Sequence, residues 1–170
     1  FLLRRLKKDV LTELPDKIES TMYAQLNKEE EKIYHAQLAQ SQKTFLEEIA
    51  ANGVERSQIK ILALLTRLRQ ACCSPKLFLD NYNQPSSKLT LCLTIINEKI
   101  QSGSQILIFS QFTTMLDLIA DELKKQQIDY LILTGATKSS ARMHMVSQFN
   151  DGRIPVFLIS LKAGGVGLNL

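Results

Sequence analysis

The periodicity of hydrophobic and polar positions changes twice along the chain. The stretch DKIESTMYAQL, residues 16 to 26, alternates between two sides, which is the two-residue period of a strand with one wetter face. Between Asn27 and about residue 80, apolar residues recur every three or four positions, as in helices that bury one stripe. From residue 87 onward, short apolar runs alternate with helical patterns. The pattern predicts a strand over Ile18 to Leu26, a helical region and then an αβ region.

The helical region contains two predicted helices. The first begins at Asn27, with Glu30 three positions on as a capping box. The stretch ANGVE, residues 51 to 55, breaks the pattern, and the second helix ends before Pro75. The apolar stripe of the first is Tyr34, Leu38, Ser41, Phe45 and Ile49, and that of the second is Ile61, Leu64, Leu65, Leu68 and Cys72. The polar stretch NYNQPSS, residues 81 to 87, gives the best internal boundary.

The αβ region shows three short, apolar strands separated by helices. QILIFS, YLILTG and VFLIS are the strands. One predicted helix is capped by Ser87 and closed by Gly103, a second carries Leu116 and Leu123 on one face, and a third runs from about Ser140 to Phe149. Such strands predict a parallel sheet whose two faces are both covered by helices.

The three strands end in similar residues. They continue as SQFT from Ser110, TGATK from Thr134 and SLKAGG from Ser160. In open parallel sheets, ligands bind beyond the carboxyl ends of the strands, and glycines let backbone N–H groups approach an anion. Taken singly, a Ser or Thr after a strand is more often a helix cap, and a glycine more often a turn. Three similar loops on one edge favour an anion site.

Other classes of site have little support. No G-K-[ST] follows the glycines, and GGVGLN lacks the G-x-G-x-x-G spacing. Cys72, Cys73 and Cys92 form no C-x-x-C pair, and His35 and His144 stand far apart, which argues against a disulfide framework and a metal site. The sequence contains no run of eighteen apolar residues, so we expect no membrane span. The net charge of +4 permits a polyanionic partner.

Longer stretches resemble a known family. QILIFSQFTTMLDLI, YLILTGATKSSARMHMVSQFN and VFLISLKAGGVGLNL resemble motifs IV, IVa and V of the second helicase lobe in Swi/Snf-type ATP-dependent DNA translocases of helicase superfamily two. FLLRRLKKDVLTELPDKIE resembles the junction leading into that lobe. LRQACCSPKLF is similar to the family's LRQ-x-C-x-H-P segment, with Ser74 where His is common.

The resemblance implies a fold and a domain organisation. It implies an α/β fold of RecA-like, P-loop NTPase type, with the strand at Ile18 to Leu26 joining the sheet. Residues 1–26 would be the junction and first strand, 27–86 an inserted helical protrusion with its linker, and 87–170 the second helicase lobe. That lobe would be incomplete, because motif VI would follow Leu170.

The resemblance also implies binding residues. Those near the DNA backbone would be Ser110, Gln111, Thr134, Gly135, Arg142, Ser160 and Lys162. Those near the nucleotide would be Gly165, Gly167 and Asn169. No catalytic residue is expected in this chain, because the family's Walker motifs lie in the first lobe, which would hold most of ATP and Mg²⁺. We therefore expect the chain alone to be inactive and the full protein to be a DNA-stimulated ATPase that moves along duplex DNA or a protein–DNA complex.

Three other functions stay open at this point. The same fold serves RNA-directed helicases of superfamily two. A Rossmann domain for nucleotide binding or methyl transfer would need a glycine-rich loop after the first strand and an acidic residue ending the second. A plain interaction module would use the glycines only as turns. In every case we expect an intracellular protein without a membrane partner, in the cytoplasm or nucleoid of a bacterium or the nucleus of a eukaryote.

Overall fold

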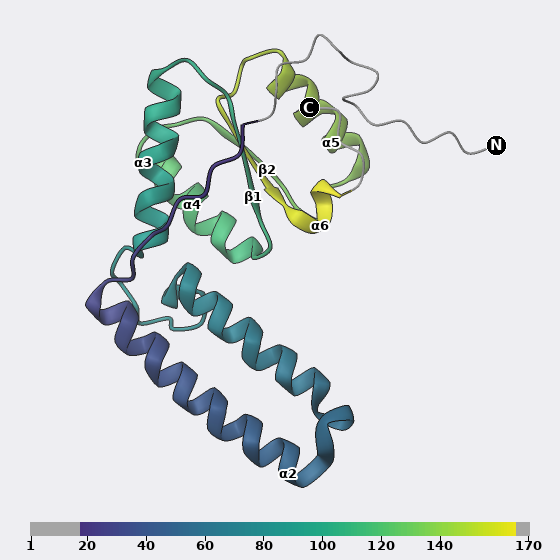
Figure 1. The fold of residues 1–170 in the computed structure, drawn as a ribbon. Helices are drawn as coiled ribbons and strands as arrows, with labels where there is room; N and C mark the ends of the chain where they lie inside the picture. Colours follow the sequence, from purple (N-terminus) through teal and green to yellow (C-terminus); the bar gives the residue numbers. More distant parts are fainter. Residues whose placement is uncertain (1–17, 166–170) are drawn as a thin grey trace, which may run out of the picture.

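The computed structural model describes residues 18–165 as a helical hairpin that projects from an α/β body (Figure 1). The elements in chain order are α2 (Lys28–Cys73), the short 3₁₀ helix η1 (Pro75–Leu77), α3 (Ser87–Gln101), β1 (Ile106–Ser110), α4 (Thr113–Lys125), β2 (Tyr130–Leu133), α5 (Ser139–Asn150), β3 (Val156–Ser160) and α6 (Leu161–Gly164). The predicted helices and the three predicted apolar strands are confirmed.

The three strands form a parallel sheet in the order β1-β3-β2. The central strand, β3, is the most apolar, and every one of its residues is buried. Helices cover both faces of a central strand and other strands pair with both of its edges, so a wholly apolar sequence suits that position. The predicted parallel sheet is therefore confirmed among the described residues.

Helices cover the two faces of the sheet unequally. In Figure 1, α3 and α4 lie on one side of the sheet and α5 and α6 on the other. Val156 and Leu158 pack on the α3 and α4 side, and Phe157 and Ile159 on the other. On this second side α5 contacts β2, and the short α6 contacts β3 and the end of β1. The predicted cover on both faces is therefore present but incomplete at β1, whose Leu107 and Phe109 are 39% and 48% exposed.

The hairpin consists of two arms of α2 that reverse direction at Gly53. The capping box is confirmed at its start, where Asn27 Oδ1 accepts from Glu30 N and Glu30 Oε2 accepts from Asn27 N, each at 2.9 Å. Gly53 has φ +73° and ψ 167°, a conformation that glycine adopts far more readily than other residues. The Lys60 ammonium lies 2.6 Å from the Glu48 carboxylate and ties the arms together beside this turn. The two predicted apolar stripes line a shared gap of about 200 Å³ between the arms.

The predicted strand over Ile18 to Leu26 is wrong. These residues form no helix or strand, and the three strands of the sheet pair only with one another. Ile18, Met22 and Tyr23 are 93%, 61% and 87% exposed. Alternation shows that a segment suits an extended shape, but a strand also needs a neighbour for its N–H and C=O groups. Among residues 18–165, no strand pairs with this segment.

The start of α3 lies one residue from the predicted cap. Ser86, not Ser87, is the N-cap, and its hydroxyl oxygen accepts from Leu89 N at 3.3 Å. Gly103 has φ +74° just after the helix, as its predicted closing role requires. No helix within residues 18–165 has the length and hydropathy needed to cross a bilayer.

Candidate nucleic-acid interface

The carboxyl ends of the strands place three hydroxyl residues in one row. Ser110 of β1 pairs with Ser160 of β3 in the ladder. Leu133 of β2 pairs with Ile159, so Thr134 follows at the level of Ser160. The prediction that the three loops share one edge of the sheet is therefore confirmed.

Two of these hydroxyls serve the turns that follow them. Ser110 Oγ accepts from Phe112 N at 3.1 Å and donates to Phe112 O at 3.0 Å. Ser160 is 3% exposed, and its Oγ accepts from Ala163 N at 3.3 Å as the N-cap of α6. Both hydroxyls thus shape the backbone of the loops. A ligand at this edge would instead meet the exposed residues Gln111, Gly135 and Lys162.

The loop after β2 is held by Thr137 and Arg142. Thr134 N donates to Thr137 Oγ1 at 3.0 Å, and Thr137 N donates to Thr134 O at 3.1 Å. Arg142, in the first turn of α5, donates from Nε to Thr137 O at 3.0 Å. A guanidinium carries five N–H donors, so this bond leaves donors for an anion at the same loop. Arg142 can therefore order the loop and bind a phosphate at once.

The charges at this edge all have one sign. Residues 110–113, 134–142 and 160–165 include Lys138, Arg142 and Lys162 and no Asp or Glu. The ammonium groups of Lys138 and Lys162 form no ion pair with any residue between 18 and 165. Such an edge attracts phosphate oxygens. It does not suit Mg²⁺, which takes carboxylate oxygens, and no described group of three or more His, Cys, Asp or Glu could hold a metal.

The glycines after β3 allow a close approach between α6 and β1. A Cβ on Gly164 would lie 2.9 Å from Phe109 Cε1 and 3.2 Å from Ile159 Cγ2, closer than side chains normally pack. Gly165 ends α6, and its N–H donates to Leu161 O at 3.2 Å. Gly164 is thus required by packing, whereas Gly165 stands at the exposed edge. Gly167 and Asn169 lie outside the described residues, so their predicted nucleotide contacts stay predictions.

Two cations next to this edge were missed by the sequence reasoning. Arg69 of α2 and Lys88 of α3 line a cleft of about 710 Å³ together with Ser110 and Gln111. Both cations are exposed. Their positions in the sequence, at the end of one helix and the start of another, give no sign that both helix ends flank β1. Only the packing of α2 and α3 against the body brings them to the predicted site.

The cysteines of the chain also line this cleft. Cys72, Cys73 and Cys92 are its three cysteines, and all are partly buried there. Burial raises the pKa of the Cys73 and Cys92 thiols, so both remain protonated near neutral pH. A protonated thiol is a poor nucleophile and a poor metal ligand. Cys73 and Cys92 therefore act as apolar lining of the cleft.

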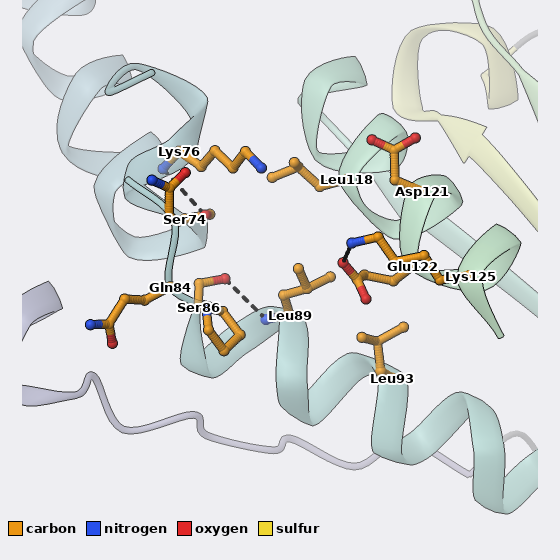
Figure 2. A pocket seen from close by; sticks show the side chains of 12 residues that line it. Ser74, Lys76, Gln84, Ser86, Leu89, Leu93, Leu118, Asp121, Glu122 and Lys125 are labelled. Carbon is orange, nitrogen blue, oxygen red and sulfur yellow. Dashed lines mark hydrogen bonds and ion pairs between the residues drawn. The ribbon is translucent and has the colours of Figure 1, made fainter. Parts of the chain in front are cut away.

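A second pocket lies between the linker and helices α3 and α4 (Figure 2). Its volume is about 330 Å³. Ser74 and Lys76 lie on one side of it in Figure 2, and Asp121 and Glu122 on the other. The charges that line it balance, and Lys125 Nζ is held 2.6 Å from Glu122 Oε1. None of the strand-end residues lines this pocket, so it is separate from the candidate interface.

Two family descriptions together match most of the chain. Residues 1–77 match the family described as SNF2-related domain, and residues 87–170 match the helicase conserved C-terminal domain. An uncharacterized ATP-dependent helicase of Mycoplasma pneumoniae is 38% identical over 174 residues. The chromatin structure-remodeling complex subunit snf21 of Schizosaccharomyces pombe is 34% identical over 187 residues. All of this chain is covered in both alignments, but it spans only 16% and 15% of the lengths of these relatives.

Solved structures show the same fold. The C-terminal domain of the Sulfolobus solfataricus SWI2/SNF2 ATPase matches with a TM-score of 0.77 and 31% identity, over 91% of this chain and 68% of that one. The core of that ATPase in complex with dsDNA matches with a TM-score of 0.74 and 28% identity, over 93% of this chain and 34% of that one. The predicted RecA-like α/β fold and the predicted resemblance are both confirmed by these matches.

Proposed function

Because the chain belongs to the SWI2/SNF2 family of ATP-dependent helicases and remodellers, we propose that it forms the second motor lobe of a DNA-stimulated ATPase. In this proposal the lobe binds the backbone of duplex DNA, alone or in a protein–DNA complex. A first lobe of the same protein holds most of the ATP and Mg²⁺. Hydrolysis then moves the two lobes against each other along the DNA, and the 170-residue chain alone does not hydrolyse ATP.

The single observation that supports DNA binding is the row of strand ends on one edge. Gln111, Gly135 and Lys162 are exposed there, Arg142 orders the loop after β2, and no carboxylate interrupts the loops. Phosphates need donors and positive charge, whereas base reading needs side chains that reach into a groove. The arrangement therefore favours backbone contacts without sequence preference. The related ATPase core solved with dsDNA supports the choice of duplex DNA.

The nucleotide side of the proposal depends on the loop after β3. Gly165 closes α6 at the same edge as Lys162, so movement of this loop can connect DNA and nucleotide. In this proposal Gly165, Gly167 and Asn169 would approach ATP from this lobe. The loops offer phosphate ligands but no carboxylate for Mg²⁺, which fits a metal held by the first lobe.

The test is the ATPase activity of the full-length protein with and without duplex DNA. We expect DNA to stimulate the wild type, and Arg142→Ala or Lys162→Ala to reduce that stimulation. Each substitution should also reduce the salt dependence of DNA binding by about one phosphate contact. Lys99→Ala is the control, because Lys99 is exposed near the far end of α3. Stimulation by RNA but not by DNA would support the RNA-directed alternative and contradict the proposal.

A further inference from the structure

The cleft that contains Arg69 and Lys88 has an apolar floor. Its volume of about 710 Å³ lies within the usual range of ligand-binding pockets in proteins. Most of its lining is aromatic or aliphatic and comes from both arms of α2 and from β1, α4 and α6, including Tyr34, Leu68, Phe109 and Phe112. Phe109 is 48% exposed, which is unusual for a large ring on a sheet strand. The floor therefore presents apolar surface that a partner could bury.

The charges of the cleft are exclusively positive. Arg69 and Lys88 are the charged residues among those that line it, and both are exposed. Neither has a carboxylate partner within residues 18–165. The Arg69 guanidinium lies 6.0 Å from the centre of the Phe112 ring, a cation–π contact that holds the charge beside the apolar floor.

We propose that this cleft docks an acidic, amphipathic peptide segment of a partner protein. Apolar side chains of the segment would cover Phe109 and Phe112, and its carboxylates would pair with Arg69 and Lys88. A DNA strand would satisfy the two cations but would leave most of the apolar floor without a partner. A neutral apolar segment would cover the floor but leave the cations unused. Only a ligand that carries both features matches both parts of the cleft.

Docking of this segment excludes DNA from the same place. Ser110 and Gln111 line the cleft and also belong to the proposed DNA edge. A bound segment would therefore compete with DNA and lower DNA-stimulated ATP hydrolysis. This competition rests on the proposed function, whereas the docking itself does not.

The three cysteines provide a direct readout of occupancy, because they all line the cleft. The full-length protein is treated with N-ethylmaleimide, and the alkylation rate of each cysteine is followed by peptide mapping in a mass spectrometer. The probe is a 15-residue synthetic peptide in which glutamate alternates with leucine and phenylalanine. Its control replaces every glutamate with glutamine. We expect the acidic peptide to slow alkylation of Cys72, Cys73 and Cys92 together, and the control peptide to have little effect.

A charge-reversed variant tests the role of the two cations. Arg69→Glu with Lys88→Glu should weaken binding of the acidic peptide about tenfold or more, measured as the ratio of alkylation rates with and without peptide. The matched control is Arg56→Glu with Lys99→Glu, which changes exposed cations on the same two helices outside the cleft. This control should bind like the wild type.

Four outcomes would overturn the proposal. The first is that the acidic peptide does not bind, and the second is that it binds equally to the two charge-reversed variants. The third is that the thiols are already protected from alkylation in the free full-length protein. The fourth is that duplex DNA protects the thiols but the peptide does not. The third would mean that the protein's own chain covers the cleft, and the last that the cleft is a DNA track. DNA-stimulated ATPase activity without peptide tests the proposed function separately, so the two failures are distinguishable.

Discussion

The carboxylate of Glu30 accepts hydrogen bonds from both the backbone N–H and the hydroxyl of Ser87, 57 residues further along the chain. The same carboxylate accepts from Asn27 N in the capping box of α2. Glu30 is 1% exposed, so these donors satisfy a buried charge. One side chain thus binds the N-terminal turns of α2 and α3, where helix dipoles favour a negative charge. It anchors the hairpin to the α/β body.

Loss of this carboxylate should destabilise the protein strongly. Glu30→Ala leaves the N–H groups of Asn27 and Ser87 without their acceptor, and we expect a loss of about 2–3 kcal/mol in the free energy of unfolding. Glu30→Gln keeps one acceptor oxygen and should lose less. Urea denaturation measures both variants, with Glu29→Ala, an exposed neighbour, as the control. Equal stability of Glu30→Ala and Glu29→Ala would contradict the anchoring role.

The reversal of α2 at Gly53 should require glycine because of its backbone conformation and not because a side chain would lack room. A Cβ at Gly53 would meet nothing within 4 Å, but φ is +73°. Gly53→Ala should therefore cost about 1–3 kcal/mol through strain alone. Gly135→Ala is the matched control for stability, because its surroundings are equally open and its φ is not positive. If thermal unfolding shows the same stability for both variants, strain at Gly53 is not what the turn requires.

The parts of the fold that the sequence predicted are those set by local patterns. The apolar run of β3 and the capping box at Asn27 each involve neighbours in the sequence, and both were predicted correctly. The shared edge of Ser110 and Ser160 was also predictable, because parallel strands end together. The helix-cap role of Ser160 is the one more often expected for a Ser after a strand, whereas the turn that the Ser110 hydroxyl holds was not predicted, since it depends on local geometry.

The features that the sequence did not predict involve distant partners. Glu30 and Ser87 meet across 57 residues, and Arg69 and Lys88 line one cleft only because α2 and α3 lie beside β1. The alternating segment over Ile18 to Leu26 was expected to be a strand, but it pairs with none of the described strands. A periodic pattern describes one segment, whereas pairing and packing depend on a second segment that the pattern does not identify.

Gly164 and Gly165 should respond differently to the same substitution. Gly164→Ala puts a methyl group 2.9 Å from Phe109 Cε1, and we expect a loss of about 1–3 kcal/mol by overpacking. Gly165→Ala meets only Leu161 O at 3.7 Å, an ordinary contact, and should cost less. Adding Phe109→Leu to Gly164→Ala should restore part of the stability, which a double-mutant cycle measures. Additive effects of these two changes would show that Phe109 is not the obstacle.

Comparison of Cys73 with Cys92 should separate the effects of burial and of nearby charge on the pKa of a thiol. Burial raises the pKa of both thiols, while the nearby positive charges of Lys88 and Arg69 partly oppose this rise at Cys73. An ordinary thiol is half ionised at about pH 8.5, and its alkylation rate begins to level off above that pH. Because the raised pKa keeps Cys73 and Cys92 protonated to higher pH, their alkylation rates should continue to rise beyond this point. Lys88→Gln removes one of the opposing charges at Cys73, raises that pKa further and should slow alkylation there at pH 8.

Cys92 is the internal control for this substitution, because burial accounts for its shift without a charged neighbour. Its alkylation rate at pH 8 should therefore be the same in Lys88→Gln and the wild type. The urea-unfolded protein supplies the reference, in which both cysteines should react at the same rate in the two variants. Equal slowing of Cys73 and Cys92 would mean that Lys88→Gln changes the exposure of the whole cleft. An unchanged rate at Cys73 would mean that the ammonium does not act on this thiol.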